Sequence, residues 1–505
     1  MNFSKSPIWL LSIYRIQASL AAFQPRCRRI LTHIQQKPTG HLSFRTMPHS
    51  TMTSEPYLKN QAKGESDAVH DIPLTICRKC KGEGKIILPP SRKAKKRHKI
   101  SKVDEGQGLI SKQQSQKPPP RIDGCKECQG SGLVDNINST CSDQSKPSAQ
   151  FPHIAIVGGG LGGLALATAC RHRSIPFTVY ERDADFFQRS QGYGLTMQQA
   201  SRALKALGIP VPLSEGIVST KHVVHTHEGK VVGEWGLRKW RGDDADKYKQ
   251  EAAKNTKNSN KRQNVHIARQ SLRFELLKAL GGSSQVKWGH KLVKYDEKVD
   301  HITTLFEVTK EDGTTSTVTY NNANLLVGAD GIRSSVRKQW LGESLTPLRY
   351  LGCIVILGIC PLTPAEVENM ESPLLDGETV FQTADGSTRI YMMPYSKKEY
   401  MWQLSFPMEE EDAKRLSKKG PLALKDESIR KCQSWHNPVA SILEHTPVSL
   451  VSGYPVYDRS LASKEMLQNR VSASSCRRVT CLGDAMHPMS PFKGQGEWSC
   501  CLFQQ

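Results

Sequence analysis

His153-Ile-Ala-Ile-Val-Gly-Gly-Gly-Leu-Gly-Gly163 is the stretch of sequence that decides the fold of most of this chain. The apolar run that ends at Val157 predicts a buried β-strand, and the small residues from Leu161 to Arg173 predict a helix directly after the glycines. A second strand is predicted at Phe177-Thr-Val-Tyr180. This strand–helix–strand unit of about 30 residues predicts an α/β fold of the Rossmann-like type.

The glycines between strand and helix satisfy the pattern G-x-G-x-x-G at Gly158, Gly160 and Gly163. The first permits a tight turn, the second lets the backbone approach a pyrophosphate, and the third allows close helix–strand packing. Glu181 lies 18 residues after Gly163, where an acid can accept hydrogen bonds from ribose hydroxyls, and we assign Arg182 to the same site. The pattern predicts dinucleotide binding, but it leaves NAD and FAD open.

Two later motifs favour FAD. Gly328-Ala-Asp330-Gly331-Ile-Arg333 follows a predicted strand at 325–327, and Gly483-Asp484-Ala-Met-His487-Pro488-Met-Ser-Pro491-Phe-Lys-Gly494-Gln-Gly496 follows another at 479–482. In this order and spacing, the three motifs resemble the flavin motifs of the para-hydroxybenzoate hydroxylase family of FAD-dependent monooxygenases. The resemblance covers residues 152–496.

This resemblance implies an FAD-binding domain over residues 151–505 with an inserted mixed-sheet substrate domain at about 350–410. It also implies hydroxylation of a small aromatic substrate with NAD(P)H and O2, the flavin supplying the redox chemistry. The cofactor residues that it implies are Asp484 for the ribityl hydroxyls, Asp330 and Gly331 for the channel shared with the nicotinamide, Arg269 for the pyrophosphate, and Pro491, Gly494 and Gly496 for the wall beside the flavin ring. Catalytic side chains stay unassigned, and we expect His487 to be structural rather than a general base.

The substrate pocket is expected under the inserted sheet, with Arg389, Tyr391 and Tyr395 as candidate lining residues. After Gly496 the family continues with a long helix, whereas this sequence reads Glu497-Trp-Ser-Cys-Cys-Leu-Phe-Gln-Gln505. We therefore expect a C-terminally truncated domain. Two alternatives to a monooxygenase follow, namely another FAD-dependent reductase or dehydrogenase on the same fold, and an inactive flavoprotein that acts through a second module.

That second module, at residues 76–135, contains two copies of C-x-x-C-x-G-x-G. They supply Cys77 and Cys80, then Cys125 and Cys128, and four thiolates complete a tetrahedral structural zinc site. A redox dithiol and unrelated cysteines are the alternatives. The repeats resemble half of the DnaJ-type cysteine-rich domain, which implies a protein partner that docks on the module.

The net charge of +22 is concentrated near the N-terminus, where residues 1–150 hold 25 Lys and Arg against 11 Asp and Glu. The basic run at 92–102 favours a solvated, disordered loop over a nucleic-acid patch. Residues 1–55 carry no acid before Glu55, which predicts a transit peptide for a plastid or mitochondrion; the alternative is a disordered tail on a cytoplasmic protein. Residues 136–150 are expected to form a linker. The longest apolar run, 351–362, is too short for a transmembrane helix.

Overall fold

The computed structural model describes twelve segments of the chain, and all structural statements below refer to them. They are residues 74–89, 91, 121–135, 151–188, 192–197, 200–209, 216–236, 265–310, 312–396, 398–463, 465–468 and 478–488. The predicted transit peptide, the basic run at 92–102, the linker at 136–150, and Pro491, Gly494 and Gly496 lie outside the described residues.

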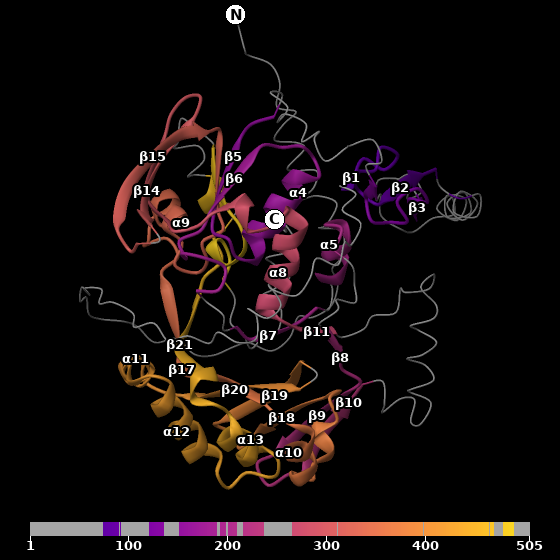
Figure 1. Ribbon diagram of the computed structural model, residues 1–505, viewed down its shortest axis with the longest axis vertical. Helices are drawn as coiled ribbons and strands as arrows, with labels where there is room; N and C mark the ends of the chain where they lie inside the picture. The colour runs from indigo at the N-terminus through magenta and orange to yellow at the C-terminus, as the bar shows by residue number, and fades with distance from the viewer. Residues whose placement is uncertain are drawn as a thin grey trace, which may run out of the picture.

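A five-stranded parallel sheet forms the centre of the nucleotide domain (Figure 1). Its order is β12-β6-β5-β16-β22, and every pair of neighbours is parallel. The strands are β5 (Ile154–Val157), β6 (Phe177–Tyr180), β12 (Val286–Lys287), β16 (Leu325–Gly328) and β22 (Val479–Cys481). This arrangement confirms the predicted Rossmann-like fold, because the strand–helix–strand unit lies at its centre.

Both faces of this sheet are covered, which explains why every residue of β5 is buried. Helices α4 (Leu161–Arg171) and α8 (Arg269–Leu280) pack against each other on one face. The other face packs on α9 (Ser335–Leu341) and on an antiparallel sheet of β13 (His290–Glu297), β14 (Ile302–Thr309) and β15 (Thr315–Ala323). The Tyr180 ring of β6 stacks on Phe306 of β14, with 4.3 Å between centroids.

The substrate sheet has seven strands and lies below the nucleotide domain in Figure 1. Its order is β10-β9-β18-β19-β20-β17-β21; β9 and β18 are parallel, and the other pairs are antiparallel, so the sheet is mixed. The strands are β9 (Lys221–Thr226), β10 (Val231–Trp235), β17 (Leu348–Pro361), β18 (Thr379–Ala384), β19 (Arg389–Ser396), β20 (Glu399–Pro407) and β21 (Val451–Arg459). The predicted range of 350–410 contains four of these strands, and the structure adds β9, β10 and β21 from either side.

Helices cover the lower face of the substrate sheet and enclose a second hydrophobic core around Trp402. They are α10 (Pro364–Asn369), α11 (Glu410–Lys419), α12 (Pro421–Cys432) and α13 (Val439–His445). A small sheet of β7 (Gly194–Thr196), β8 (Ile217–Val218) and β11 (Val265–Ala268) lies between the two domains, and α5 (Ala200–Ala206) packs on the core of the nucleotide domain beside α8. Within the described part of the chain, no helix is long and apolar enough to cross a membrane.

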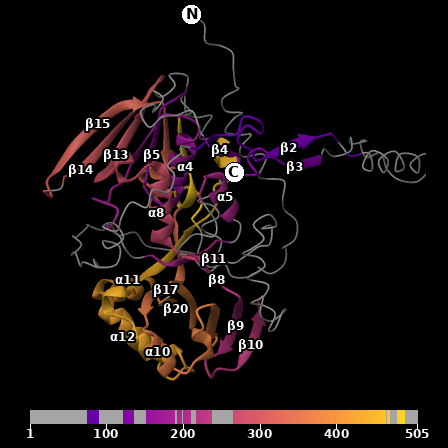
Figure 2. The same cartoon turned by 45° about the vertical axis from the view of Figure 1, so that its right-hand side comes forward.

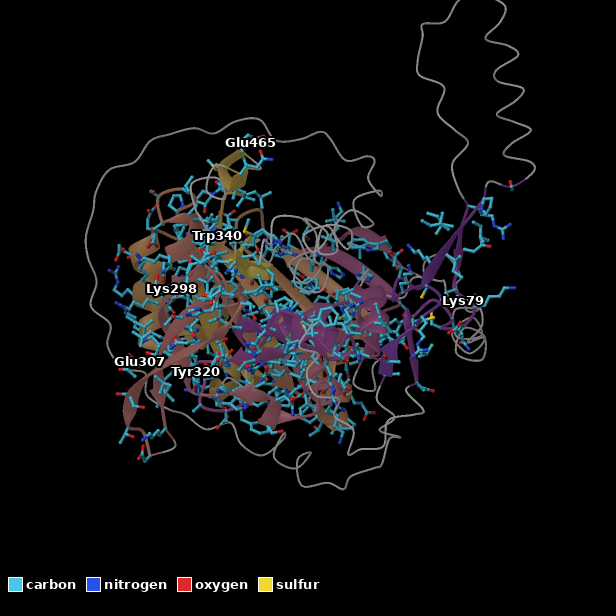
Figure 3. All side chains as sticks on the ribbon, turned by 90° about the horizontal axis from the view of Figure 1, so that it is seen from above. Lys79, Lys298, Glu307, Tyr320, Trp340 and Glu465 are labelled. Atoms are coloured by element: carbon cyan, nitrogen blue, oxygen red, sulfur yellow. The ribbon has the colours of Figure 1, made fainter. Side chains whose placement is uncertain are left out.

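The cysteine module consists of residues 74–89 and 121–135 and lies beside the nucleotide domain (Figure 2). Strand β1 (Leu74–Ile76) pairs with β4 (Leu133–Asp135), and β2 (Lys85–Leu88) pairs with β3 (Arg121–Gly124). The β1–β4 end lies near α4 and α5, whereas the β2–β3 end points away from the body of the molecule. Seen from above, the module stands at the edge of the molecule, where Lys79 is labelled (Figure 3).

Candidate functional site

Two positions of the phosphate loop, Gly158–Gly163, accept only glycine. Gly158 has φ of +114°, and a Cβ atom placed on it would lie 2.3 Å from the Ala329 carbonyl oxygen. A Cβ atom on Gly163 would lie 1.9 Å from the Gly158 carbonyl oxygen. Gly160 caps α4 without a side-chain hydrogen bond, so the first N–H groups of the helix are open to an anion. The tight turn at Gly158 and the close packing at Gly163 are therefore present, while the role of Gly160 toward a pyrophosphate stays a prediction.

Glu181 is held rigidly against this loop. It is only 8% exposed, and its Oε2 accepts a hydrogen bond from the Gly159 N–H at 2.6 Å. Its Oε1 accepts from the Asp183 N–H at 3.1 Å. Each carboxylate oxygen has a further lone pair, so the same group can accept from ribose hydroxyls. Arg182, which we assigned to the same site, has an exposed side chain.

A residue that the sequence did not reveal holds the other side of the loop. Arg273 of α8 is 4% exposed, and its Nε donates to the Gly159 carbonyl oxygen at 2.8 Å. Its Nη1 donates to the Phe186 carbonyl oxygen at 3.3 Å, and its guanidinium lies 4.8 Å from the Phe186 ring centroid. The only sequence signal for this role is an arginine next to the buried Leu272 of an amphipathic helix.

Asp330 and Gly331 follow β16, as the second motif predicts. Asp330 Oδ2 accepts from the backbone N–H of Ser335 at 2.8 Å and of Val336 at 3.3 Å, so it binds the first N–H groups of α9, whose N-cap is Ser334. Its Oδ1 is buried and has no hydrogen-bond partner in the described part of the chain. Burial raises the pKa of Asp330. A buried carboxylate oxygen without a donor costs free energy, and a ligand hydroxyl would relieve that cost.

Arg269 and Asp484 come together although more than 200 residues separate them. Arg269 begins α8, and its Nη2 lies 3.9 Å from where a Cβ atom on Gly160 would be, so its guanidinium reaches the phosphate loop. Burial raises the pKa of Asp484, while the nearby Arg269 and His487 act in the opposite direction. Tyr454 of β21 lies near both, and burial raises its pKa to about 12. This cluster joins the nucleotide domain to the substrate sheet.

A cavity of about 290 Å³ opens beside this cluster. Its walls are both polar and apolar and come from the substrate sheet, the turn before β21, the segment before β7 and the start of α8. They consist of Gly192, Tyr193, Arg269, Leu357, Gly358, Ile359, Met401, Leu450, Ser452 and Tyr454. The Tyr454 side chain keeps 38% of its surface exposed, which is consistent with its place in the cavity wall. Apart from Arg269, the sequence analysis assigned none of these residues to the site.

The three predicted lining residues lie on β19, whose alternate side chains share one face. Tyr391 and Tyr395 pack with Val380, Met393 and Met401, and the Tyr395 hydroxyl donates to the Gly192 carbonyl oxygen at 3.3 Å. Arg389 Nε donates to Gln382 Oε1 at 2.8 Å. None of the three is among the residues that line the cavity. They extend the sheet face on which the cavity lies.

The four predicted metal ligands form a compact cluster in the cysteine module. The sulfur atoms of Cys77, Cys80, Cys125 and Cys128 all lie within 4.8 Å of one another. Two pairs are 3.8 and 3.6 Å apart, close to the separation of about 3.8 Å that tetrahedral zinc–thiolate bonds impose. The N–H groups of Gly84 and Gly132 each donate to a cysteine sulfur at 3.2 Å. The glycines of both repeats therefore direct N–H groups at sulfur. Such N–H groups stabilise the thiolate form of cysteine, which is the form that binds a cation.

Residues 152–497 match the family model of the FAD binding domain. The chain belongs to this FAD-binding family. The match contains the phosphate loop, Asp330 and Asp484. The buried Oδ1 of Asp330, which has no partner among the described residues, and the open start of α4 fit the polar groups of such a cofactor.

The chain is 26% identical over 344 residues to an aurachin C monooxygenase/isomerase of Stigmatella aurantiaca, covering 68% of this chain and 76% of that protein. It is 26% identical to the 6-hydroxynicotinate 3-monooxygenase of Pseudomonas fluorescens, and the match covers 69% of this chain and 79% of that protein. The chain is also 26% identical to a chloroplastic zeaxanthin epoxidase of Nicotiana plumbaginifolia. That match covers 70% of this chain but only 48% of the epoxidase, so the chain spans about half of the epoxidase's length.

Among solved structures, the 2,6-dihydroxypyridine-3-hydroxylase of Arthrobacter nicotinovorans matches with a TM-score of 0.52 and 19% identity. The match covers 70% of this chain and 82% of that one. At this identity the likeness concerns the fold, and it agrees with the parallel nucleotide sheet and the mixed substrate sheet described above.

Proposed function

We propose that this chain is an FAD-dependent monooxygenase that hydroxylates a small aromatic substrate with NADH or NADPH and O2. The observation that supports this best is the position of the cavity, which shares Arg269 with the predicted flavin site and is lined by Tyr454, a neighbour of Arg269 and Asp484. A monooxygenase needs its substrate beside the flavin, and a cavity next to the predicted flavin site would meet that need. The similarity to 6-hydroxynicotinate 3-monooxygenase supports an aromatic substrate.

The residues described above would each have a separate task toward FAD. The phosphate loop and the start of α4 would bind the pyrophosphate together with Arg269, and Glu181 would bind the ribose hydroxyls. Asp484 and the unpartnered Oδ1 of Asp330 would accept from further hydroxyls. Bound FAD would supply the electron transfer and the activation of O2.

The cavity walls would hold the substrate and keep water away from it. Leu357, Ile359 and Met401 offer an apolar surface to an aromatic ring, and Ser452 and Tyr454 offer hydroxyl groups to its polar substituents. An apolar wall with a few polar groups orients a small ring without requiring it to be charged.

The test is a turnover assay on the purified full chain, loaded with FAD and given NADH or NADPH. Phenols and hydroxypyridines serve as probes, and ¹⁸O2 is used so that mass spectrometry can detect the oxygen transferred. We expect probe-stimulated NAD(P)H oxidation with ¹⁸O in the product. Oxidation of NAD(P)H without ¹⁸O in any product would instead indicate a reductase or dehydrogenase. A folded chain that does not bind FAD would instead favour an inactive protein that acts through its cysteine module.

As a second proposal, the cysteine module binds one structural zinc ion through Cys77, Cys80, Cys125 and Cys128. The four buried sulfurs at tetrahedral spacing support it. Cys80→Ser should reduce the zinc content measured by mass spectrometry, whereas Cys353→Ser, a matched change on β17, should not. An equal zinc content in both variants would exclude this site. The protein partner of the module stays a prediction from its resemblance to DnaJ-type domains.

A further inference from the structure

The two ends of the cysteine module have different surroundings, although their sequences are near repeats. At the β2–β3 end, Ile87 and Ile122 face each other across the strand pair and are 67% and 61% exposed. At the β1–β4 end, Leu133 is only 6% exposed. A strand pair this short cannot bury a leucine by itself, so the nucleotide domain must cover it.

The contact on the nucleotide domain is made by Gly208, which follows α5. A Cβ atom placed on Gly208 would lie 2.3 Å from Leu74 Cδ1, 3.4 Å from Leu133 Cδ1 and 3.7 Å from His172 Nε2. Gly208 also has φ of +76°, so a side chain there would be strained as well as obstructed. The two leucines of the module therefore pack directly on the backbone at Gly208, next to the C-cap of α4.

The glycine repeats show the same asymmetry. A Cβ atom on Gly82, in the first repeat, would lie 3.4 Å from Arg173 Nη2, just after α4. The equivalent atom on Gly130, in the second repeat, would have only the Gly84 carbonyl oxygen within 4 Å. One repeat therefore faces α4 and the other does not.

The contact is not ionic: it combines the two leucines with a hydrogen-bonding interaction between the His172 side chain and the Leu74 backbone. Arg78, Lys79 and Lys81 of the module are positively charged, and so are Arg171 and Arg173 at the end of α4. Among the described residues, no ion pair joins the module to the nucleotide domain. Such a contact depends on the shape of the β1–β4 end, and a small cysteine module keeps its shape only while its metal is bound.

Helix α4 connects this contact to the phosphate loop. It has 11 residues, which corresponds to a length of about 16 Å, with the phosphate loop at one end and His172 and Arg173 at the other. His172 is buried, and its Nε2 lies 2.9 Å from the Leu207 carbonyl oxygen, so the end of α4 is tied to the segment that the module covers.

We propose that the cysteine module packs on the FAD-binding domain and stabilises it, so that metal binding at the four cysteines strengthens FAD binding. The β1–β4 end holds the C-terminal end of α4 and the residues after α5, and loss of the metal releases both. By linkage, FAD must then also strengthen metal binding. This inference rests on the two sites of the proposed function, and it adds a coupling between them.

The test uses the full chain, loaded with FAD and zinc, and follows flavin fluorescence during heating to obtain the midpoint of flavin release. Removing zinc with the chelator TPEN should lower this midpoint by about 2–4 °C and weaken FAD binding severalfold. Leu74→Asp, or Leu74→Ala if the first variant fails to fold, should retain zinc, release flavin at the lower midpoint, and respond little to TPEN. Ile87→Asp, the matched change at the free end, should behave like the unmodified chain.

The coupling is refuted if zinc removal leaves the release midpoint and the FAD dissociation constant unchanged in the unmodified chain. It is also refuted if Leu74→Asp retains the full response to TPEN. Zinc content and flavin absorbance are measured on the starting protein. A chain without zinc or without FAD would overturn the corresponding site, whereas a chain that binds both independently would overturn the coupling alone.

Discussion

The Gly159 N–H donates a hydrogen bond of 2.6 Å to Glu181 Oε2, which joins the phosphate loop to the end of the second strand. Arg273 donates to the Gly159 carbonyl oxygen at 2.8 Å from the opposite side. The peptide groups on both sides of Gly159 are thus held by buried charged side chains of opposite sign. The loop is therefore shaped before a ligand arrives, which reduces the entropy cost of binding FAD.

Glu181→Gln should weaken FAD binding about tenfold, or about 1.4 kcal/mol. The neutral amide loses the charge-assisted bond to Gly159, and its NH2 group must face one of two backbone N–H donors. Titration of the apo chain with FAD, followed by flavin fluorescence, measures the dissociation constant. Glu307→Gln is the control, because that carboxylate is 45% exposed and pairs with Lys291. Equal constants for the two variants would contradict the assigned role.

Arg273→Met should lower the free energy of unfolding by about 2 kcal/mol, even without FAD. Methionine has a similar length but cannot donate to the carbonyl oxygens of Gly159 and Phe186, which are left in a buried region. Urea unfolding of the apo chain, followed by circular dichroism, measures the change. The same substitution at the exposed Arg415 should have little effect. A stability equal to that of the Arg415 variant would show that Arg273 does not hold the loop.

The nucleotide half of the fold could be predicted because its signals are local. Strand, glycines and helix occupy adjacent residues, so the sequence from His153 to Gly163 predicts the loop, whereas Ala329 and Arg273, which also shape it, come from distant segments. The cysteine cluster could be predicted for the same reason, because each repeat supplies two neighbouring cysteines.

The cavity could not be predicted in the same way, because its walls come from distant segments. Tyr193, Leu357 and Tyr454 are brought together by the pairing of β17 with β21 and by packing across the domain boundary. The residues chosen from the sequence, on β19, share the correct sheet face, but the cavity lies toward β17 and β21. Strand order in a mixed sheet is a tertiary property, so residue alternation identifies a face and not a position along the sheet.

Asp484→Asn should stabilise the apo chain at neutral pH while it weakens FAD binding. Burial raises the pKa of Asp484, so the folded state holds its proton to a higher pH than the unfolded state. As the pH rises from the ordinary pKa of 3.8 through the raised pKa, Asp484 lowers the free energy of unfolding of the chain. This loss of stability persists at neutral pH. Asparagine removes the charge and therefore the cost.

Thermal unfolding of the apo variant and the unmodified chain between pH 4 and pH 8 checks this prediction. The gain in melting temperature should be largest near neutral pH and should shrink toward pH 4. Asp426→Asn, at an exposed position of α12, should show no such trend. A stability difference that is independent of pH would mean that the buried charge of Asp484 is not its cause.

Direct titration of the purified apo chain with FAD in a calorimeter tests the central claim that the phosphate loop of this chain holds FAD. We predict one FAD per chain, and no measurable binding after Gly163→Ala, because the added Cβ atom would lie 1.9 Å from the Gly158 carbonyl oxygen. Gly233→Ala, where the added atom meets nothing within 4 Å, should bind FAD like the unmodified chain. A folded chain that binds no FAD, or FAD binding that survives Gly163→Ala, would contradict the account.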